Sequence, residues 1–240
     1  MAEAVRQLPF ALVHGGCEAS WVWDDVRDQL GRPVIAVDLA GRDGNPANFG
    51  SITLARWVAD VGAALDAARA GRAVIVSHSL GGITATEFAV SHPERVAALV
   101  YISAIIPADG QSMAEALAGQ RAETLFAADG GFWPGERDAL CQSLFNGDAE
   151  LGSAVLDRVM PEPAGPLCAP MRTAQVPDVP IWYLRLGDDH GLPPQEQTQM
   201  ITNLPRPVTV LDIEGAPHQV MNSDPAGTAA ILRRIAEPLG

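Results

Sequence analysis

The stretch that decides the fold is Ser77-His78-Ser79-Leu80-Gly81-Gly82. It follows the apolar, β-branched run Arg72-Ala73-Val74-Ile75-Val76, which is typical of a buried strand, and precedes a helical pattern from Ile83 to Val90. A serine between small residues at such a turn is the layout of a nucleophile elbow, which strains the serine backbone and lifts its hydroxyl above the sheet. Ser77 replaces the first glycine of the usual G-x-S-x-G pattern, so an ordinary strand–helix turn remains an alternative.

A nucleophilic serine needs a histidine base and a carboxylate that orients it, and both follow downstream at strand ends. His218 comes directly after the strand-like run 207–213, on a loop of the kind where open α/β sheets bind ligands. Asp188 and Asp189 come after another such run, 180–186. One of these two carboxylates is expected to orient His218, while the other caps the turn or faces water.

A glycine-rich turn follows the first predicted strand, 9–13, and reads His14-Gly15-Gly16-Cys17. Glycines at this point let backbone amides face outward, as an oxyanion hole requires. We therefore predict that the N–H groups of Gly16 and Leu80 are the oxyanion donors. Of the other histidines, His14, His92 and His190 are interpreted as structural or surface residues.

Composition excludes several classes of function. The 240 residues carry a net charge of −13 without a basic run, which argues against nucleic-acid and anionic-membrane partners. The chain has no lysine, so Schiff-base chemistry, pyridoxal phosphate anchoring and a Walker A loop are not available. No G-x-G-x-x-G turn follows the first strand, and the three cysteines lack metal-ligand spacing. We expect a reduced cytoplasmic protein without signal peptide, membrane span, metal or cofactor.

Strand and helix patterns alternate along most of the chain, which predicts a parallel sheet with helices on both faces. The expected strands are 9–13, 33–38, 73–76, 97–103, 180–186 and 207–213, and the expected helices are 21–30, 52–70, 83–91, 194–203 and 224–237. The alternation breaks in 107–176, where helical patterns at 113–119, 139–145 and 149–159 precede a non-helical stretch, 160–166. We interpret 107–176 as a helical cap inserted into a core made of 1–106 and 177–240.

Several of these motifs together resemble a known family. The run Leu12-Val13-His14-Gly15-Gly16-Cys17 with Trp21-Val22-Trp23, the elbow, and the loops 189–194 and 215–218 are similar to those of the small α/β-hydrolases related to plant methylesterases and hydroxynitrile lyases. The resemblance implies an α/β-hydrolase fold with a mostly parallel six-stranded sheet and a small helical cap. It also implies cofactor-free chemistry on a modest, largely apolar substrate. In that family the triad aspartate stands shortly before a paired proline, which favours Asp189 over Asp188.

Two positions separate the branches of this family. The lyase branch has a threonine after the early histidine and a lysine after the catalytic histidine, whereas this chain has Gly15 and Gln219. That lysine stabilises the charge of the departing cyanide, so its absence argues against cyanohydrin cleavage. The resemblance is therefore to the esterase-like branch.

The sequence predicts a serine hydrolase that cleaves a carboxylic ester, lactone or thioester through an acyl-enzyme, with Ser79, His218 and Asp189 as its triad. The partner is a small-molecule ester, and a homodimer is left open. Two alternatives remain: a non-hydrolytic enzyme of this fold, such as a C–C lyase, cyclase or cofactor-free oxygenase, and a receptor-like protein with a vestigial triad. The expected substrate-pocket residues are Gly15, Phe126, Phe132, Trp133, Leu144, Phe145 and Gln219.

Overall fold

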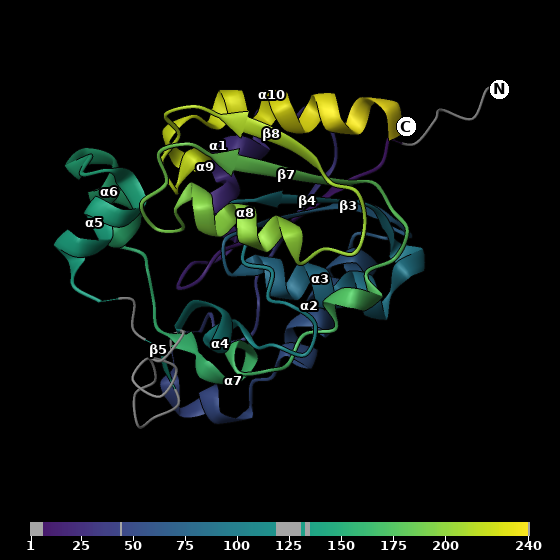
Figure 1. Ribbon diagram of the computed structural model, residues 1–240, viewed down its shortest axis with the longest axis horizontal. Helices are drawn as coiled ribbons and strands as arrows, with labels where there is room; N and C mark the ends of the chain where they lie inside the picture. The colour runs from purple at the N-terminus through teal and green to yellow at the C-terminus, as the bar shows by residue number, and fades with distance from the viewer. Residues whose placement is uncertain (1–6, 44, 119–130, 133–134, 240) are drawn as a thin grey trace.

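The central sheet has six parallel strands (Figure 1), and the computed structural model describes residues 7–43, 45–118, 131–132 and 135–239. In spatial order the strands are β2 (Val34–Val37), β1 (Phe10–Val13), β3 (Ala73–His78), β4 (Val96–Ile102), β7 (Ile181–Leu186) and β8 (Thr209–Ile213). The strands β1, β3 and β4 are buried along their whole length, because helices cover both sides of the sheet. The predicted fold class is confirmed.

Helices pack on both faces of the sheet, as Figure 1 shows. One face carries α2 (Leu54–Ala67), α3 (Gly81–Ser91) and α8 (Pro194–Thr202), and the other carries α1 (Asp24–Arg27), α9 (Val220–Ser223) and α10 (Pro225–Ala236). The helix α2 begins where the Thr53 hydroxyl accepts the Arg56 N–H, and it packs a stripe of apolar residues at helical spacing onto the sheet. Short 3-10 helices lie at Ser20–Trp23, Pro46–Ser51, Pro93–Arg95, Thr173–Gln175 and Glu237–Leu239.

The segment between β4 and β7 contains α4 (Met113–Ala118), β5 (Gly131–Phe132), α5 (Arg137–Phe145), α6 (Ala149–Leu156), β6 (Glu162–Pro163) and α7 (Ala164–Leu167). The helices α5 and α6 lie side by side beyond the carboxyl ends of the strands and share a small apolar cluster (Figure 1). The non-helical prediction for 160–166 is wrong in part. Residues 162–163 pair antiparallel with β5, and Ala164 then begins α7.

A close approach between α3 and β1 fixes the turn at the end of β3. A Cβ atom added to Gly81 would stand 2.5 Å from the His14 carbonyl oxygen and 3.0 Å from that of Val13. Both contacts are with backbone atoms, which cannot swing aside as a side-chain end can. Glycine at position 81 is therefore required by packing, as expected from the elbow motif.

We predict that Gly81→Ala lowers the free energy of unfolding by about 1–3 kcal/mol, because the added methyl group overpacks the α3–β1 crossing. The matched control is Gly62→Ala in α2, where an added Cβ meets only the Phe88 ring edge at 3.9 Å. That change should raise the free energy of unfolding by about 0.5–1 kcal/mol through helix propensity. Urea denaturation measures both variants, and equal effects would contradict the packing argument.

Candidate active site

Ser79 stands at the carboxyl end of β3 in a strained backbone conformation. Its φ is +49°, in the left-handed region that a non-glycine residue adopts at a cost of about 1–3 kcal/mol. Two hydrogen bonds tie it to β4 and the residues that follow: its N–H donates to the Ile102 carbonyl at 3.2 Å, and its carbonyl accepts the Ile105 N–H at 2.9 Å. The strand β4 and the residues after it thus determine how the elbow turns.

The ring of His218 is bound to Asp189. The His218 Nδ1 atom lies 2.7 Å from the Asp189 Oδ2 atom, and both side chains are buried. An ionised carboxylate only accepts hydrogen bonds, so Nδ1 carries the proton and Nε2 keeps its lone pair in the neutral ring. This is the tautomer in which a histidine can act as a base.

Four hydrogen bonds converge on the Asp189 carboxylate. Oδ1 accepts the N–H groups of Gly191 at 2.8 Å and Leu192 at 2.7 Å, and Oδ2 accepts the Ser103 hydroxyl at 2.6 Å besides the His218 ring. Burial alone raises the pKa of Asp189, but the attraction of His218 and these hydrogen bonds outweigh it and hold the pKa below its ordinary value. Asp189 is therefore an anion at neutral pH.

Asp188 lies on the surface, outside this arrangement. Its side chain is 54% exposed and accepts the Asn146 amide at 2.7 Å, while its carbonyl accepts the same amide at 2.8 Å. His190 stands beside it, with Nε2 at 3.3 Å from an Asp188 carboxylate oxygen. Of the two adjacent aspartates, the one that contacts His218 is Asp189.

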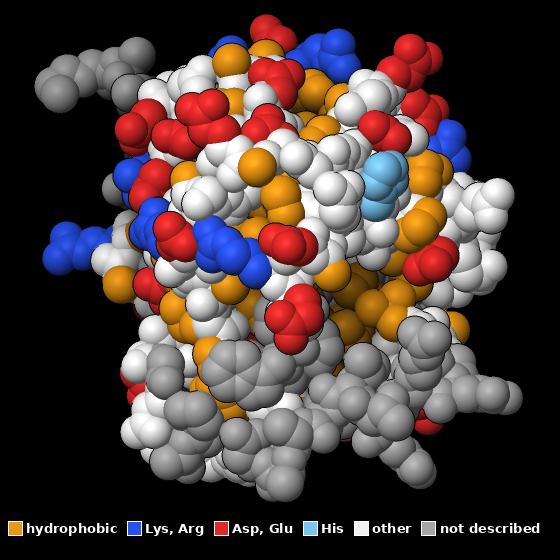
Figure 2. All heavy atoms as spheres, turned by 90° about the vertical axis from the view of Figure 1, so that its left-hand side faces the viewer, with side chains coloured by type: hydrophobic (Ala, Val, Ile, Leu, Met, Phe, Trp, Pro, Cys, Tyr) orange, Lys and Arg blue, Asp and Glu red, His pale blue; other side chains and the backbone are white. Residues whose placement is uncertain are grey.

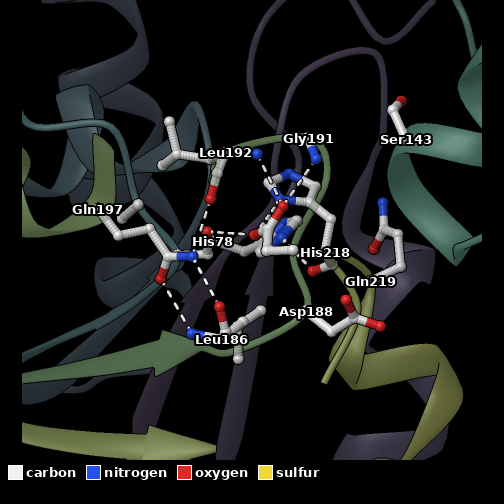
Figure 3. Close-up of polar contacts among 12 residues, drawn as sticks. His78, Ser143, Leu186, Asp188, Gly191, Leu192, Gln197, His218 and Gln219 are labelled. Carbon is white, nitrogen blue, oxygen red and sulfur yellow. Dashed lines mark hydrogen bonds and ion pairs between the residues drawn. The ribbon is translucent and has the colours of Figure 1, made fainter. Parts of the chain in front are cut away.

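Gln197 of α8 fixes the loop that carries Asp189 (Figure 3). Its side chain accepts the Leu186 N–H at 2.9 Å and donates to the carbonyls of Leu186 at 3.0 Å and Leu192 at 2.8 Å. This amide is fully buried, so it replaces the backbone partners that the loop lacks where β7 ends. Gln197 lies within the expected helix 194–203, but no motif in the sequence pointed to this contact.

The expected oxyanion donors lie next to Ser79. Leu80 is the residue before α3, and Gly16 is in the turn after β1. A Cβ atom on Gly16 would be 3.1 Å from the Leu80 side chain, which puts the two residues in contact. Among the described residues, neither the Gly16 nor the Leu80 N–H has a hydrogen-bond acceptor. Both amides are thus free to bind a ligand oxygen.

A buried ion pair supports the turn that carries Gly16. Glu162 of β6 accepts the Cys17 N–H, and its Oε1 atom lies 2.6 Å from Nη2 of Arg42. The Cys17 carbonyl accepts the Met160 N–H at 2.9 Å, so both peptide groups of Cys17 contact the segment around β6. Burial raises the pKa of Glu162 more than Arg42 and the Cys17 amide lower it. No sequence motif pointed to this pair.

His14 is buried beside the Arg42–Glu162 pair and contacts Arg42. This position fits its interpretation as a structural residue. Its Nδ1 atom lies 2.8 Å from the Gly15 carbonyl, and Nε2 accepts the Leu39 N–H at 3.3 Å. Burial and the nearby Arg42 charge lower the pKa of His14 well below its ordinary value, which keeps the ring neutral. Its contacts join the turn after β1 to the end of β2.

A cavity of about 260 Å³ opens at Ser79, at the carboxyl ends of the strands. Figure 2 looks onto this side of the molecule, where apolar side chains are visible inside a hollow. Its apolar wall is formed by Leu80, Ile105, Met113, Leu117, Leu140, Leu144 and Leu192. Ser79, His218 and Gly16 line it as well, so the expected nucleophile, base and oxyanion donors surround one space.

The predicted pocket residues have different locations. Leu144 and Gln219 line the cavity, whereas Phe145 is buried in the apolar cluster between α5 and α6. Gly15 lies just outside the lining, with its N–H bound to Glu18. Phe126 and Trp133 are outside the described residues, and of Phe132 only its place in β5 is described. Phe145 differs from the expectation because the α5–α6 hairpin needs a core of its own.

Two kinds of feature are absent from the ranges that the structure describes. No helix there combines the length and apolar character needed to cross a membrane. The same residues contain no group of three or more His, Cys, Asp or Glu side chains that could hold a metal ion.

Comparison with known proteins identifies the relatives. The model of the alpha/beta hydrolase family matches residues 10–231. Methylesterase 7 of Arabidopsis thaliana is 28% identical over 97% of both chains, and putative methylesterase 19 of the same plant is 30% identical over 95% of this chain and 97% of its own. An extracellular alpha/beta-hydrolase from a Paenibacillus species superposes with a TM-score of 0.82, at 20% identity, over 95% of this chain and 98% of its own.

Breaking the Arg42–Glu162 pair should destabilise the fold strongly. We predict that Glu162→Gln lowers the free energy of unfolding by about 3–5 kcal/mol, because it leaves Arg42 buried without a counter-charge. The matched control is Asp212→Asn, which breaks an arginine pair of the same 2.6 Å length whose side chains are 32% and 58% exposed. Its loss should stay below about 1 kcal/mol. Similar losses in urea denaturation would contradict the role assigned to burial.

Proposed function

Since this chain belongs to the alpha/beta hydrolase family, we propose that it hydrolyses carboxylic esters, with Ser79, His218 and Asp189 as its catalytic triad. The observation that carries the proposal is the convergence on one cavity of a strained serine, a histidine bound to a buried aspartate, and two unbound backbone amides. The names of the methylesterase relatives support ester hydrolysis. The substrate class is a small, largely apolar ester, lactone or thioester, because apolar side chains form most of the cavity wall.

The proposed reaction has two halves. Ser79 attacks the ester carbonyl while Nε2 of His218 takes the hydroxyl proton, and Asp189 stabilises the imidazolium that results. The amides of Gly16 and Leu80 donate to the tetrahedral oxyanion, where losing one donor typically costs about 10²–10³ in rate. His218 then protonates the departing alcohol. In the second half, water attacks the acyl-enzyme with His218 as base, and the acid product leaves.

Ser79 should be the residue that reacts with a serine-directed fluorophosphonate. We expect one adduct, located on Ser79 by mass spectrometry, and no labelling of Ser79→Ala. Ser77 and Ser103 are internal controls, since both are fully buried. An adduct on another serine, or none on folded protein, would refute the assignment.

The two adjacent aspartates should differ greatly in their effect on rate. Asp189→Asn is expected to lower kcat for a short aryl ester by about 10³–10⁴, because the amide no longer fixes the His218 tautomer. Asp188→Asn makes the same chemical change on the exposed neighbour and should leave kcat nearly unchanged. If Asp188→Asn proves the more damaging in folded protein, the triad assignment is wrong.

A further inference from the structure

One corner of the cavity brings together three side chains that the proposed reaction does not use. This acceptor corner consists of Glu18, His78 and Gln219, all of which line the cavity and are at most 2% exposed. The Glu18 carboxylate accepts the Gly15 N–H at 3.1 Å and the side-chain amide of Gln219. No arginine in the described part of the chain forms an ion pair with Glu18, and the nearby Arg42 is bound to Glu162. Glu18 is thus a buried carboxylate without a permanent counter-charge.

The other two members of the corner also present acceptor atoms. Because a carboxylate cannot donate, the Gln219 amide turns its nitrogen toward Glu18, and its Oε1 atom has no partner among the described residues. The His78 Nε2 atom lies 3.0 Å from the His218 carbonyl and must carry a proton to bind it. Burial lowers the pKa of His78 and keeps the ring neutral, so its Nδ1 atom is a second unpartnered acceptor.

Glycine at position 15 leaves the space that these groups occupy. A Cβ atom there would stand 2.9 Å from both the Glu18 Oε2 atom and the His78 Nδ1 atom, which are themselves 3.9 Å apart. A larger residue such as threonine would push both groups aside. Glycine at position 15 is therefore needed to accommodate a carboxylate and an imidazole.

A buried acceptor without a donor costs about 1–3 kcal/mol, and a ligand that supplies the donor recovers that energy. A second carboxylate placed beside Glu18 would instead be repelled. Figure 3 shows Gln219 next to His218, and Glu18 binds the amide of Gly15, the neighbour of Gly16. The corner therefore adjoins the place where the ester carbonyl is expected to lie.

We propose that the acceptor corner is a specificity subsite for esters that carry a hydrogen-bond donor, a hydroxyl or ammonium group, on the α-carbon of the acyl part, and that it rejects esters with a carboxylate there. The proposal rests on the ester hydrolysis proposed above, in the same cavity. The apolar wall of the same cavity accepts the hydrocarbon part of the substrate. A hydroxyl and an ammonium group can both donate this hydrogen bond, and the experiment distinguishes between them.

The test uses four methyl esters that differ only at the α-carbon: phenylacetate (hydrogen), mandelate (hydroxyl), phenylglycine (ammonium, below the pKa of its amine) and phenylmalonate half-ester (carboxylate). Each kcat/KM is divided by the hydroxide-catalysed rate of the same ester to remove intrinsic reactivity. We expect mandelate or phenylglycine to exceed phenylacetate by about tenfold, the effect of one hydrogen bond, and phenylmalonate to fall at least about tenfold below. A further advantage of phenylglycine over mandelate would assign the preference to the Glu18 charge.

The variant Glu18→Gln keeps the shape of the side chain and removes its charge, so the penalty on phenylmalonate and any extra preference for phenylglycine should shrink toward zero. The matched control is Glu87→Gln in α3, another buried carboxylate, which binds Arg172 and does not line the cavity. It should leave all four ratios unchanged. The wild-type series decides the matter even if Glu18→Gln does not fold.

Two negative outcomes have different meanings. Turnover of methyl phenylacetate without the predicted order among the four esters would overturn the subsite and leave ester hydrolysis intact. Failure to hydrolyse any of the four, with no fluorophosphonate label on Ser79, would overturn the proposed function itself.

Discussion

The Asp189 carboxylate joins the parts of the chain on which this site depends. It binds Ser103 at the end of β4, two amides of its own loop after β7, and His218 in the loop after β8. Those segments are far apart in sequence and meet only because parallel strands end at one edge of the sheet. An anion buried at that edge is stable only with several donors around it, so the same hydrogen bonds that order the loops also keep the charge that orients His218.

The sequence predicted the elements that depend on local patterns. All six strands were located to within a few residues. The fully buried strands β1, β3 and β4 are the clearest case, because a strand covered on both faces is a continuous apolar run between turn residues. The elbow was also predictable, since it requires a small residue at Gly81. Glu18, Arg42, Glu162 and Gln197 were not identified, although each is buried at the site. Nothing local distinguishes a carboxylate that will be buried from one that will be solvated.

The stretch 160–166 illustrates the same limit. Its prolines and glycine indicated an irregular connection, yet the two residues Glu162 and Pro163 form a strand whose carboxylate reaches the turn after β1. A two-residue strand has no periodicity to detect. Its position depends on the partner strand and on the Arg42 guanidinium, which compensates the charge of the Glu162 carboxylate. The segment between β4 and β7 is thus linked to the turn after β1 by a contact across 145 residues of sequence.

The two buried carboxylates beside the turn after β1, Glu18 and Glu162, have opposite electrostatic consequences. Glu162 is paired with Arg42, so the pair presents almost no net charge to the cavity. Glu18 has only neutral donors around it, and its charge acts on whatever enters. An oxyanion forming at Gly16 would be repelled by Glu18. A substrate donor that binds Glu18 offsets this repulsion, so it stabilises the transition state more than the ground state. Selectivity from the acceptor corner should therefore be expressed mainly in kcat, whereas the apolar wall, which contacts substrate and transition state alike, contributes mainly to KM.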